Sequence, residues 1–362
     1  MGIIEEIVGA VLGIAVLLDI FLLILYARAN KTIISTELSH FIWRLLVWLS
    51  QPLGRRRSYF LTFSGPVILV MVIATWGLLL SVATALIIHP NLGTAIRTNH
   101  GDTPTDFITA LYVGGSSLSF IGASDFVPQT GFFRLFYLLT SFIGVSLVSL
   151  IVTYLMELYT NLKERNTLGL KVHILSSETG DAAEVVARLG PRGQFDGGYQ
   201  NIMEWAAETA QVKESHQFYP ILFYFRFREP FYSISRTALT SLDTVTLIKT
   251  ALDDKEYGWL KESAAVDDLW RGALLELKIL AQNFISDEDM DAPPDEKTRA
   301  RWQRRYTEGV ERLQQADIKT TESGAEEYIS LRTQWDRYIT LLAPKFAYNM
   351  DEIDTAVAKV KS

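Results

Sequence analysis

The sequence predicts an all-α membrane protein with three transmembrane helices, a short re-entrant helix and loop, and a mostly helical cytoplasmic C-terminal domain. Three apolar runs, at residues 3–26, 61–88 and 132–159, are long enough to cross a bilayer, which needs about 20 mostly apolar residues. A shorter helical pattern lies between the second and third runs. From about residue 160 onward, apolar and charged residues alternate at helical spacing, which is typical of a helical soluble domain.

Residues 1–28 are predicted to form the first transmembrane helix. A cleaved signal peptide is disfavoured, because the segment begins with Glu5 and Glu6 and its apolar core is too long. Asp19 lies well inside the apolar run, where an ionisable side chain normally faces another helix or water. We consider two roles for it, an inter-subunit or conduction-linked charge and a snorkelling or pairing residue, and we favour the snorkelling or pairing residue.

Residues 29–60 are predicted to form a cytoplasmic basic linker, because Lys and Arg concentrate on the cytoplasmic side of membrane proteins. Within it, residues 41–49 are too short to span and carry two Trp, which is typical of an interfacial helix on the inner leaflet. The Arg55-Arg56-Arg57 triplet could contact anionic lipids, but we favour a topology signal. The expected location is the cell membrane, with three spans, an external N-terminus and a cytoplasmic C-terminal domain.

Residues 103–118 are predicted to form a short helix, with Thr103 as its cap and Pro104 in its first turn. The helix is too short and too polar to span, and the chain then turns through Gly122 toward Asp125 and Pro128. A short helix followed by irregular backbone between two spans predicts a re-entrant loop. Membranes tolerate such backbone only where protein or a water-filled cavity surrounds it.

This order of span, short helix, Gly-containing loop, Asp-x-x-Pro and span resembles the pore module of potassium channels, over about residues 66–159. In that family the filter reads roughly Thr-Val-Gly-Tyr-Gly-Asp, and its carbonyl oxygens replace the hydration shell of the ion. With Asp125 and Pro128 as the anchor, the resemblance implies a filter composed of Phe120, Ile121, Gly122, Ala123, Ser124 and Asp125. Phe120, Ala123 and Ser124 differ from the family's Thr, aromatic residue and second Gly.

The resemblance implies a pore module over residues 61–159, with outer helix 61–88, pore helix 103–118, filter 119–125 and inner helix 132–159. It also implies a homotetramer, since each chain contributes only one loop, and a permeant monovalent cation, K⁺ in the family, with no cofactor. Gly144 in the inner helix is implied as a gating hinge. Close packing by a small residue explains Gly144 equally well, and both interpretations stay open.

The rest of the chain divides into a helical region at residues 160–285, an acidic linker at 286–294 and C-terminal helices at 295–362. We expect the aromatic-rich run at residues 218–227 to pack inside this helical domain. Amphipathic helices are expected at residues 235–252, 257–284, 295–316, 325–342 and 351–360.

Composition excludes several classes of function. The formal net charge of -7 arises entirely after residue 159, which argues against nucleic-acid binding. The chain has no Cys, so disulfides and thiolate metal sites are excluded. We find no dinucleotide-binding fingerprint, no arginine-repeat voltage sensor and no catalytic set of residues, so we do not expect an enzyme.

Two functions from different classes follow. The favoured one is an ion channel that conducts monovalent cations with weaker or altered selectivity, because the filter lining departs from the family pattern. The alternative is a non-conducting membrane receptor or scaffold, in which the cytoplasmic helical domain is the functional part. The expected partners are other copies of the chain, membrane lipids and an unidentified cytoplasmic ligand or regulator.

Overall fold

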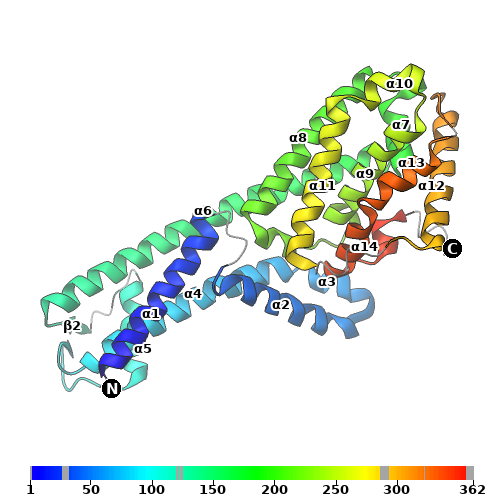
Figure 1. Ribbon diagram of the computed structural model, residues 1–362. Coiled ribbons are helices and arrows are strands. Elements are labelled where there is room, and N and C mark those ends of the chain that lie inside the picture. The colour runs from blue at the N-terminus through cyan, green and yellow to red at the C-terminus, as the bar shows by residue number, and fades with distance from the viewer. Residues whose placement is uncertain are drawn as a thin grey trace. The chain divides into compact units, whose positions relative to one another are not determined.

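The computed structural model describes residues 2–26, 32–119, 122, 125–285, 293–321 and 323–355 (Figure 1). The chain is mostly helical, and three helical stretches are long and apolar enough to cross a membrane: Gly2–Leu25, Arg57–Asn91 and Gly131–Leu175. These stretches indicate a membrane protein. The chain divides into two units, the membrane unit (Met1–Leu49 and Ser64–Tyr159) and the helical unit (Ser50–Phe63 and Thr160–Ser362).

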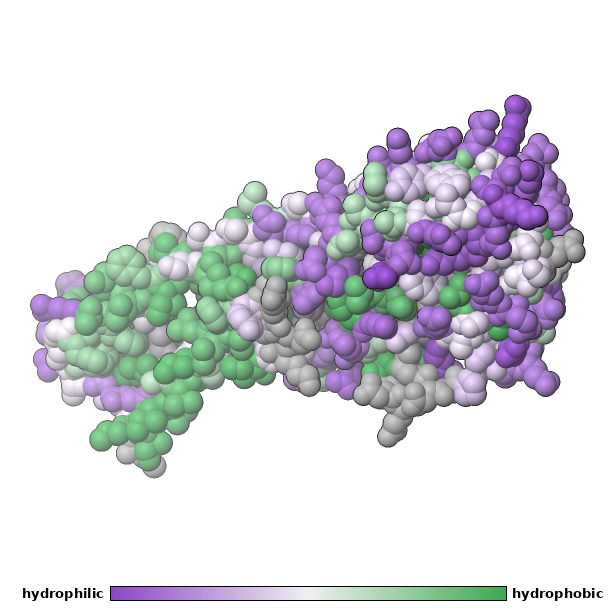
Figure 2. Space-filling model, turned by 45° about the horizontal axis from the view of Figure 1, so that its top comes forward, coloured by the Kyte–Doolittle hydropathy of each residue, from purple (hydrophilic) through white to green (hydrophobic). Residues whose placement is uncertain are grey.

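Hydrophobic side chains cover the surface of the spans, whereas hydrophilic ones cover most of the helical unit (Figure 2). The elements that begin in the membrane unit are α1 (Gly2–Ile20, continued by a π-helical turn Phe21–Leu25), α2 (Ser35–Ser50), α4 (Ser64–Ile88), β1 (Ile96–Thr98), α5 (Phe107–Leu118), β2 (Phe126–Pro128) and α6 (Gly131–Leu175).

The third span is part of a longer helix than the sequence predicts. The predicted inner helix at 132–159 continues without a break to Leu175, so that α6 has 45 residues. No Pro follows residue 159 within α6, and Leu, Lys, Glu and Arg, which are good helix formers, make up half of residues 160–175. The change in polarity at residue 160 therefore marks the end of the apolar surface and not the end of the helix.

Small residues allow the membrane helices to approach closely. A Cβ atom built on Gly9 of α1 would lie 2.6 Å from the Ala83 carbonyl oxygen of α4. A larger side chain at Gly9 would force the two backbones apart. This is the packing mode that membrane helices use in place of a hydrophobic driving force.

Asp19 connects three helices of the membrane unit. Its side chain is fully buried and accepts hydrogen bonds from the Ile34 amide (2.6 Å) and the Trp76 indole Nε1 (2.9 Å). The Ser35 amide and hydroxyl also donate to it, so a carboxylate from α1 caps the start of α2. The structure thus confirms that Asp19 is a pairing residue within the chain.

The described part of the helical unit is built from helices of 4 to 23 residues. They are α3 (Arg57–Leu61), α7 (Ala182–Leu189), α8 (Asp196–Phe218), α9 (Ile234–Ala251), α10 (Asp254–Lys261), α11 (Ala264–Phe284), α12 (Glu296–Gln315), α13 (Ala325–Thr333), α14 (Asp336–Lys345) and α15 (Met350–Ile353), with short 3₁₀ turns between several of them. As expected, the aromatic-rich run is packed inside, because Phe223, Tyr224 and Phe225 are buried.

Two predicted helices are each divided in two. Residues 257–284 break before Ser263, whose hydroxyl accepts a hydrogen bond from the Val266 amide and caps α11. Residues 325–342 break at Trp335, which lies outside helical geometry between α13 and α14. Of the helix expected at 351–360, the part that the structure describes is the short α15 and the residues that follow it to 355.

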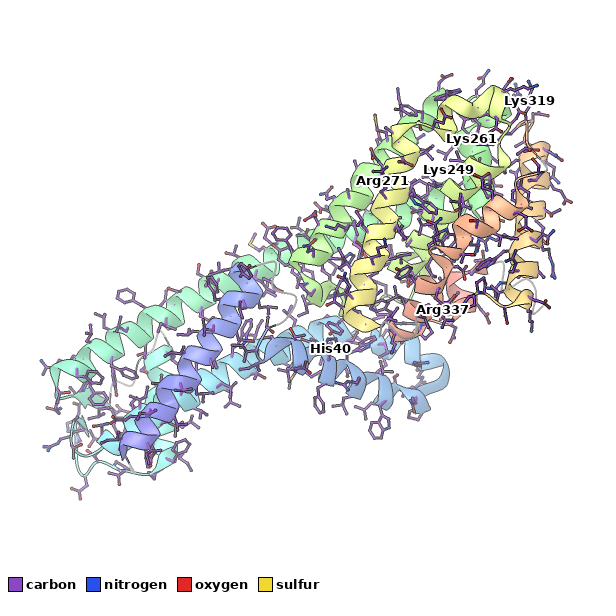
Figure 3. The ribbon with its side chains drawn as sticks, viewed as in Figure 1. His40, Lys249, Lys261, Arg271, Lys319 and Arg337 are labelled. Carbon is purple, nitrogen blue, oxygen red and sulfur yellow. The ribbon has the colours of Figure 1, made fainter. Side chains whose placement is uncertain are left out.

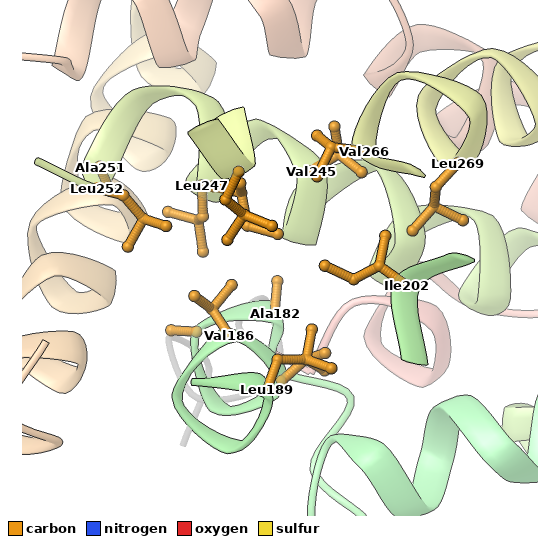
Figure 4. Close-up of a cluster of buried hydrophobic side chains, with 14 of the residues drawn as sticks. Ala182, Val186, Leu189, Ile202, Val245, Leu247, Ala251, Leu252, Val266 and Leu269 are labelled. Atoms are coloured by element: carbon orange, nitrogen blue, oxygen red, sulfur yellow. The ribbon is translucent and has the colours of Figure 1, made fainter. Parts of the chain in front are cut away.

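The sequence indicates an amphipathic helix at 235–252, but α9 is buried on almost all sides. Apolar residues of α7, α8 and α11 pack against it (Figure 4). Together with the apolar residues of α9 they belong to one larger hydrophobic core. Two of its Thr hydroxyls tolerate burial because they bond within the helix, Thr246 to the Leu242 carbonyl (2.6 Å) and Thr250 to the Thr246 carbonyl (2.7 Å), whereas those of Ser235 and Thr244 are buried without a partner among the described residues. Thr246 and Thr250 therefore add no unpaired polar group to the core.

One surface ion pair also joins two elements of the helical unit. Lys249 of α9 donates to the Asp267 carboxylate of α11 at 2.8 Å, and Arg271, one turn further along α11, donates to the same carboxylate at 2.8 Å (Figure 3). Hydrogen bonding to Lys249 is the main cause that lowers the pKa of Asp267.

Candidate functional site

A two-stranded ribbon closes the loop between the second and third spans. Strand β1 pairs antiparallel with β2, with Arg97 opposite Val127. The Asn99 amide donates to the Asp125 carbonyl (3.0 Å), which extends the ribbon by one hydrogen bond. The sequence analysis predicts no strand here, because three-residue strands carry too short an alternation to recognise. The ribbon holds together the two ends of the segment that contains α5 and Gly122.

Helix α5 begins later than predicted. The helix starts at Phe107, and its cap is Asp106, whose carboxylate accepts from the Thr109 amide (3.0 Å) and hydroxyl (2.7 Å). These hydrogen bonds lower the pKa of Asp106. The predicted cap, Thr103, instead accepts a hydrogen bond from the Thr98 amide (3.0 Å), and so stabilises the preceding loop. Asp106 was detectable from the sequence, because Asp ranks above Thr as a cap.

One face of α5 packs closely on α4. A Cβ atom built on Gly114 would lie 2.7 Å from the Thr84 hydroxyl oxygen and 2.8 Å from the Ala85 amide nitrogen. Ala110 and Val113 of α5 belong to a buried cluster that includes Ala85, and also Ile88, Leu92, Ile96, Phe126 and Phe133. The short helix is therefore fixed against the last turns of the second span.

The end of α5 contacts α6 at Gly144. A Cβ atom built on Gly144 would overlap the carbonyl oxygen of Leu118, the last residue of α5. Gly144 lies thirteen residues after Gly131, or about 20 Å along α6 at about 1.5 Å per residue. This contact gives Gly144 a packing role, and the hinge stays a prediction.

Of the six predicted filter residues, Phe120, Ile121, Ala123 and Ser124 lie outside the described residues. Gly122 has φ of +65°, in the left-handed region that favours glycine, and no atom of the described residues lies within 4 Å of a Cβ built there. Asp125 is exposed beside the first residue of β2. The structure therefore places Gly122 and Asp125 in the segment that returns from the end of α5 to the ribbon.

Helix α1 also contacts this site, through residues that the sequence analysis did not place there. His89, just after α4, lies 2.7 Å from the Glu5 carboxylate and packs edge-on against Phe107, with ring centres 5.7 Å apart. The Asn91 side chain donates to Glu6 (2.7 Å). The start of α1 is thus attached to the corner from which α5 begins.

The described residues contain no group of three or more His, Asp or Glu that could hold a metal ion. Comparison with family models, curated proteins and solved structures found no match to this chain. The candidate site is therefore defined by the geometry of α4, α5, α6 and the ribbon alone.

Proposed function

We propose that this chain forms a membrane channel that conducts monovalent cations, with α5 as a re-entrant pore helix and the following loop as the filter. The contact between Leu118, at the end of α5, and Gly144, about 20 Å along α6, is the observation that supports this most directly. Four copies around one axis would be needed to enclose the pore, and the C-terminal helical unit would lie in the cytoplasm.

The two ends of the loop lie at different levels of α6. It leaves α5 beside Gly144, whereas Phe126, where it rejoins the ribbon, shares a buried cluster with Phe133 near the start of α6. The twelve residues of α5 measure about 18 Å, less than the roughly 30 Å of a hydrocarbon core. A helix of this length that reaches α6 about 20 Å from its start, after which the chain returns to the ribbon, supports a re-entrant element.

The charges near this loop favour a cation. The C-terminal end of a helix carries a partial negative charge, and α5 ends at Leu118 beside the loop. Asp125 adds an exposed carboxylate where the loop returns, and four copies would form an acidic ring that concentrates cations. Because Phe120, Ala123 and Ser124 depart from the potassium-channel pattern, we expect weaker or altered selectivity for K⁺.

Reconstituted protein tests the proposal. We expect a cation flux into liposomes, and a reversal potential measured between K⁺ and Na⁺ solutions reports the selectivity. Gly122→Ala should abolish the flux, because a left-handed backbone costs a non-glycine residue roughly 1–2 kcal/mol and distorts the loop. Gly101→Ala is the matched control, since Gly101 also has positive φ (+74°) and open space around it but lies before α5.

Flux that survives Gly122→Ala as well as it survives Gly101→Ala would contradict the filter assignment. Wild-type protein that passes no monovalent ion would favour the receptor or scaffold alternative, in which the helical unit carries the function.

A further inference from the structure

The chain enters its second candidate span through a short helix that carries charge and exposed aromatic rings. Arg57 is the first residue of α3 and of the span Arg57–Asn91. Tyr59 and Phe63 follow, both exposed, with their rings packed edge to face at 5.5 Å. Aromatic side chains at the start of a span are typical of the headgroup level of a bilayer. Arg57 is therefore at the level where lipid phosphates lie.

A cavity of about 380 Å³ adjoins Arg57 within the helical unit. The remaining lining residues come from the end of α14 to the start of α15: Pro344, Ala347, Tyr348, Asn349, Met350 and Asp351. Residues far apart in the sequence thus enclose a space large enough for a lipid headgroup.

The charges around this cavity favour an anion. The Nε atom of Arg57 is buried and has no hydrogen-bond partner among the described residues, which is rare for a charged donor. Arg226 lies nearby, with its guanidinium 4.3 Å from the centre of the Tyr348 ring and its Nη1 donating to the Ser58 hydroxyl (2.8 Å). Burial lowers the pKa of Arg226 and the positive charge of Arg57 adds to this effect, whereas Tyr348 and the Glu352 carboxylate raise it. Asp351 is the one carboxylate among the residues that line the cavity, and its side chain or backbone already interacts with another group.

We propose that this cavity binds the phosphate group of an anionic lipid, with Arg57 as its principal ligand. A guanidinium presents several N–H donors in a plane that matches a phosphate, and basic residues beside the cytoplasmic end of a span attract anionic headgroups. The alternative role of the Arg55-Arg56-Arg57 triplet, as a topology signal, would explain its positive charge. It does not account for a cavity between Arg57 and α14–α15. This site does not depend on ion conduction.

Native mass spectrometry of the full-length protein in detergent tests the site by counting retained lipids during titration. Phosphatidic acid should bind more tightly than phosphatidylcholine with the same acyl chains. Arg57→Gln should weaken the binding of phosphatidic acid roughly tenfold. A change of this size is expected when about one hydrogen bond to a charged group is lost. Arg56→Gln removes the same charge from an exposed neighbour and should leave the affinity within about twofold.

A second pair of variants keeps Arg57 intact. Pro344 is exposed on the cavity wall, so Pro344→Glu adds a negative charge there and should weaken phosphatidic acid binding, whereas Pro344→Gln should not. Equal retention of phosphatidic acid and phosphatidylcholine, or equal binding by the Arg57 and Arg56 variants, would overturn the proposal. Inorganic phosphate that binds at Arg57 while phosphatidic acid does not would assign a soluble ligand and overturn the lipid assignment.

Discussion

At Gly144 a single hydrogen atom in place of a side chain decides how closely two helices approach. The Leu118 carbonyl of α5 lies where a Cβ atom would be, so any other residue must displace α5 or bend α6. Close packing therefore explains this glycine without a hinge. The two roles differ in what they predict for substitution by alanine.

We expect Gly144→Ala to destabilise the membrane unit by about 1–3 kcal/mol, the usual cost of adding atoms to a closely packed contact, and to reduce cation flux. Gly77→Ala is the control, because Gly77 also lies in an apolar helix but a Cβ there meets nothing within 4 Å. Thermal unfolding in detergent reports stability. If Gly144→Ala unfolds at the wild-type temperature and changes only channel opening, the hinge role is the better account.

Between elements, one ion pair adds to the apolar contact of α7 with α12. The Arg312 Nε atom donates to the Glu184 carboxylate at 2.7 Å, and the Ser177 hydroxyl donates to the same group at 3.1 Å. The hydrogen bond from Arg312 is the main cause that lowers the pKa of Glu184. The pair lies at the edge of the core that α7 and α12 form around α9.

This lowered pKa predicts the direction of a pH effect. Because the pKa of Glu184 is lower in the folded than in the unfolded state, the pair stabilises the fold fully above the unfolded value, about 4.3. That contribution is lost as the pH falls through the folded value. Glu184→Gln should therefore destabilise the protein at pH 7, by less than about 1 kcal/mol for a partly exposed pair, and the difference should vanish in acid.

Unfolding followed at several pH values for wild type, Glu184→Gln, Arg312→Gln and the double variant checks this. A coupling energy that is the same at pH 7 and at pH 3 would show that the ion pair is not its source.

Across the whole molecule, features that depend on neighbouring residues could be predicted from the sequence. Features that depend on contacts between distant residues could not. Hydropathy predicts the three spans because the bilayer sets their length through adjacent residues alone. The same reasoning finds α5 but misplaces its cap at Thr103, although the higher rank of Asp as a cap favours Asp106, whose hydrogen bonds to Thr109 the structure shows. The β1–β2 ribbon and the Gly144 contact join segments distant in the sequence, and no local pattern encodes them.

The interior of the helical unit was the least predictable part. Asp243 on α9 is fully buried and accepts hydrogen bonds from Arg305 (2.6 Å), Arg332 (2.8 Å) and Tyr328 (2.5 Å). Arg305 also pairs with Asp354 at 2.5 Å. The partners come from α12, α13 and the end of α15, so charges that look solvent-exposed in the sequence meet in the core.

Removal of one member should destabilise the helical unit strongly. We expect Asp243→Asn to cost about 3–5 kcal/mol, because it leaves Arg332 and Arg305 without their shared carboxylate in the core. Asp268→Asn is the control, an exposed position on α11. Hydrogen exchange should show faster exchange in α9, α12 and α13 for the Asp243 variant alone. Wild-type exchange rates there would mean that the remaining carboxylates compensate.

The same cluster has an evolutionary consequence. A single substitution at Asp243 or Arg332 passes through a state with an uncompensated buried charge, whereas a joint replacement by apolar residues of similar volume can be nearly neutral. Related sequences should therefore keep both Asp243 and Arg332 or replace both of them together. An alignment of its relatives in which the two positions vary independently would show that the core accepts a lone charge.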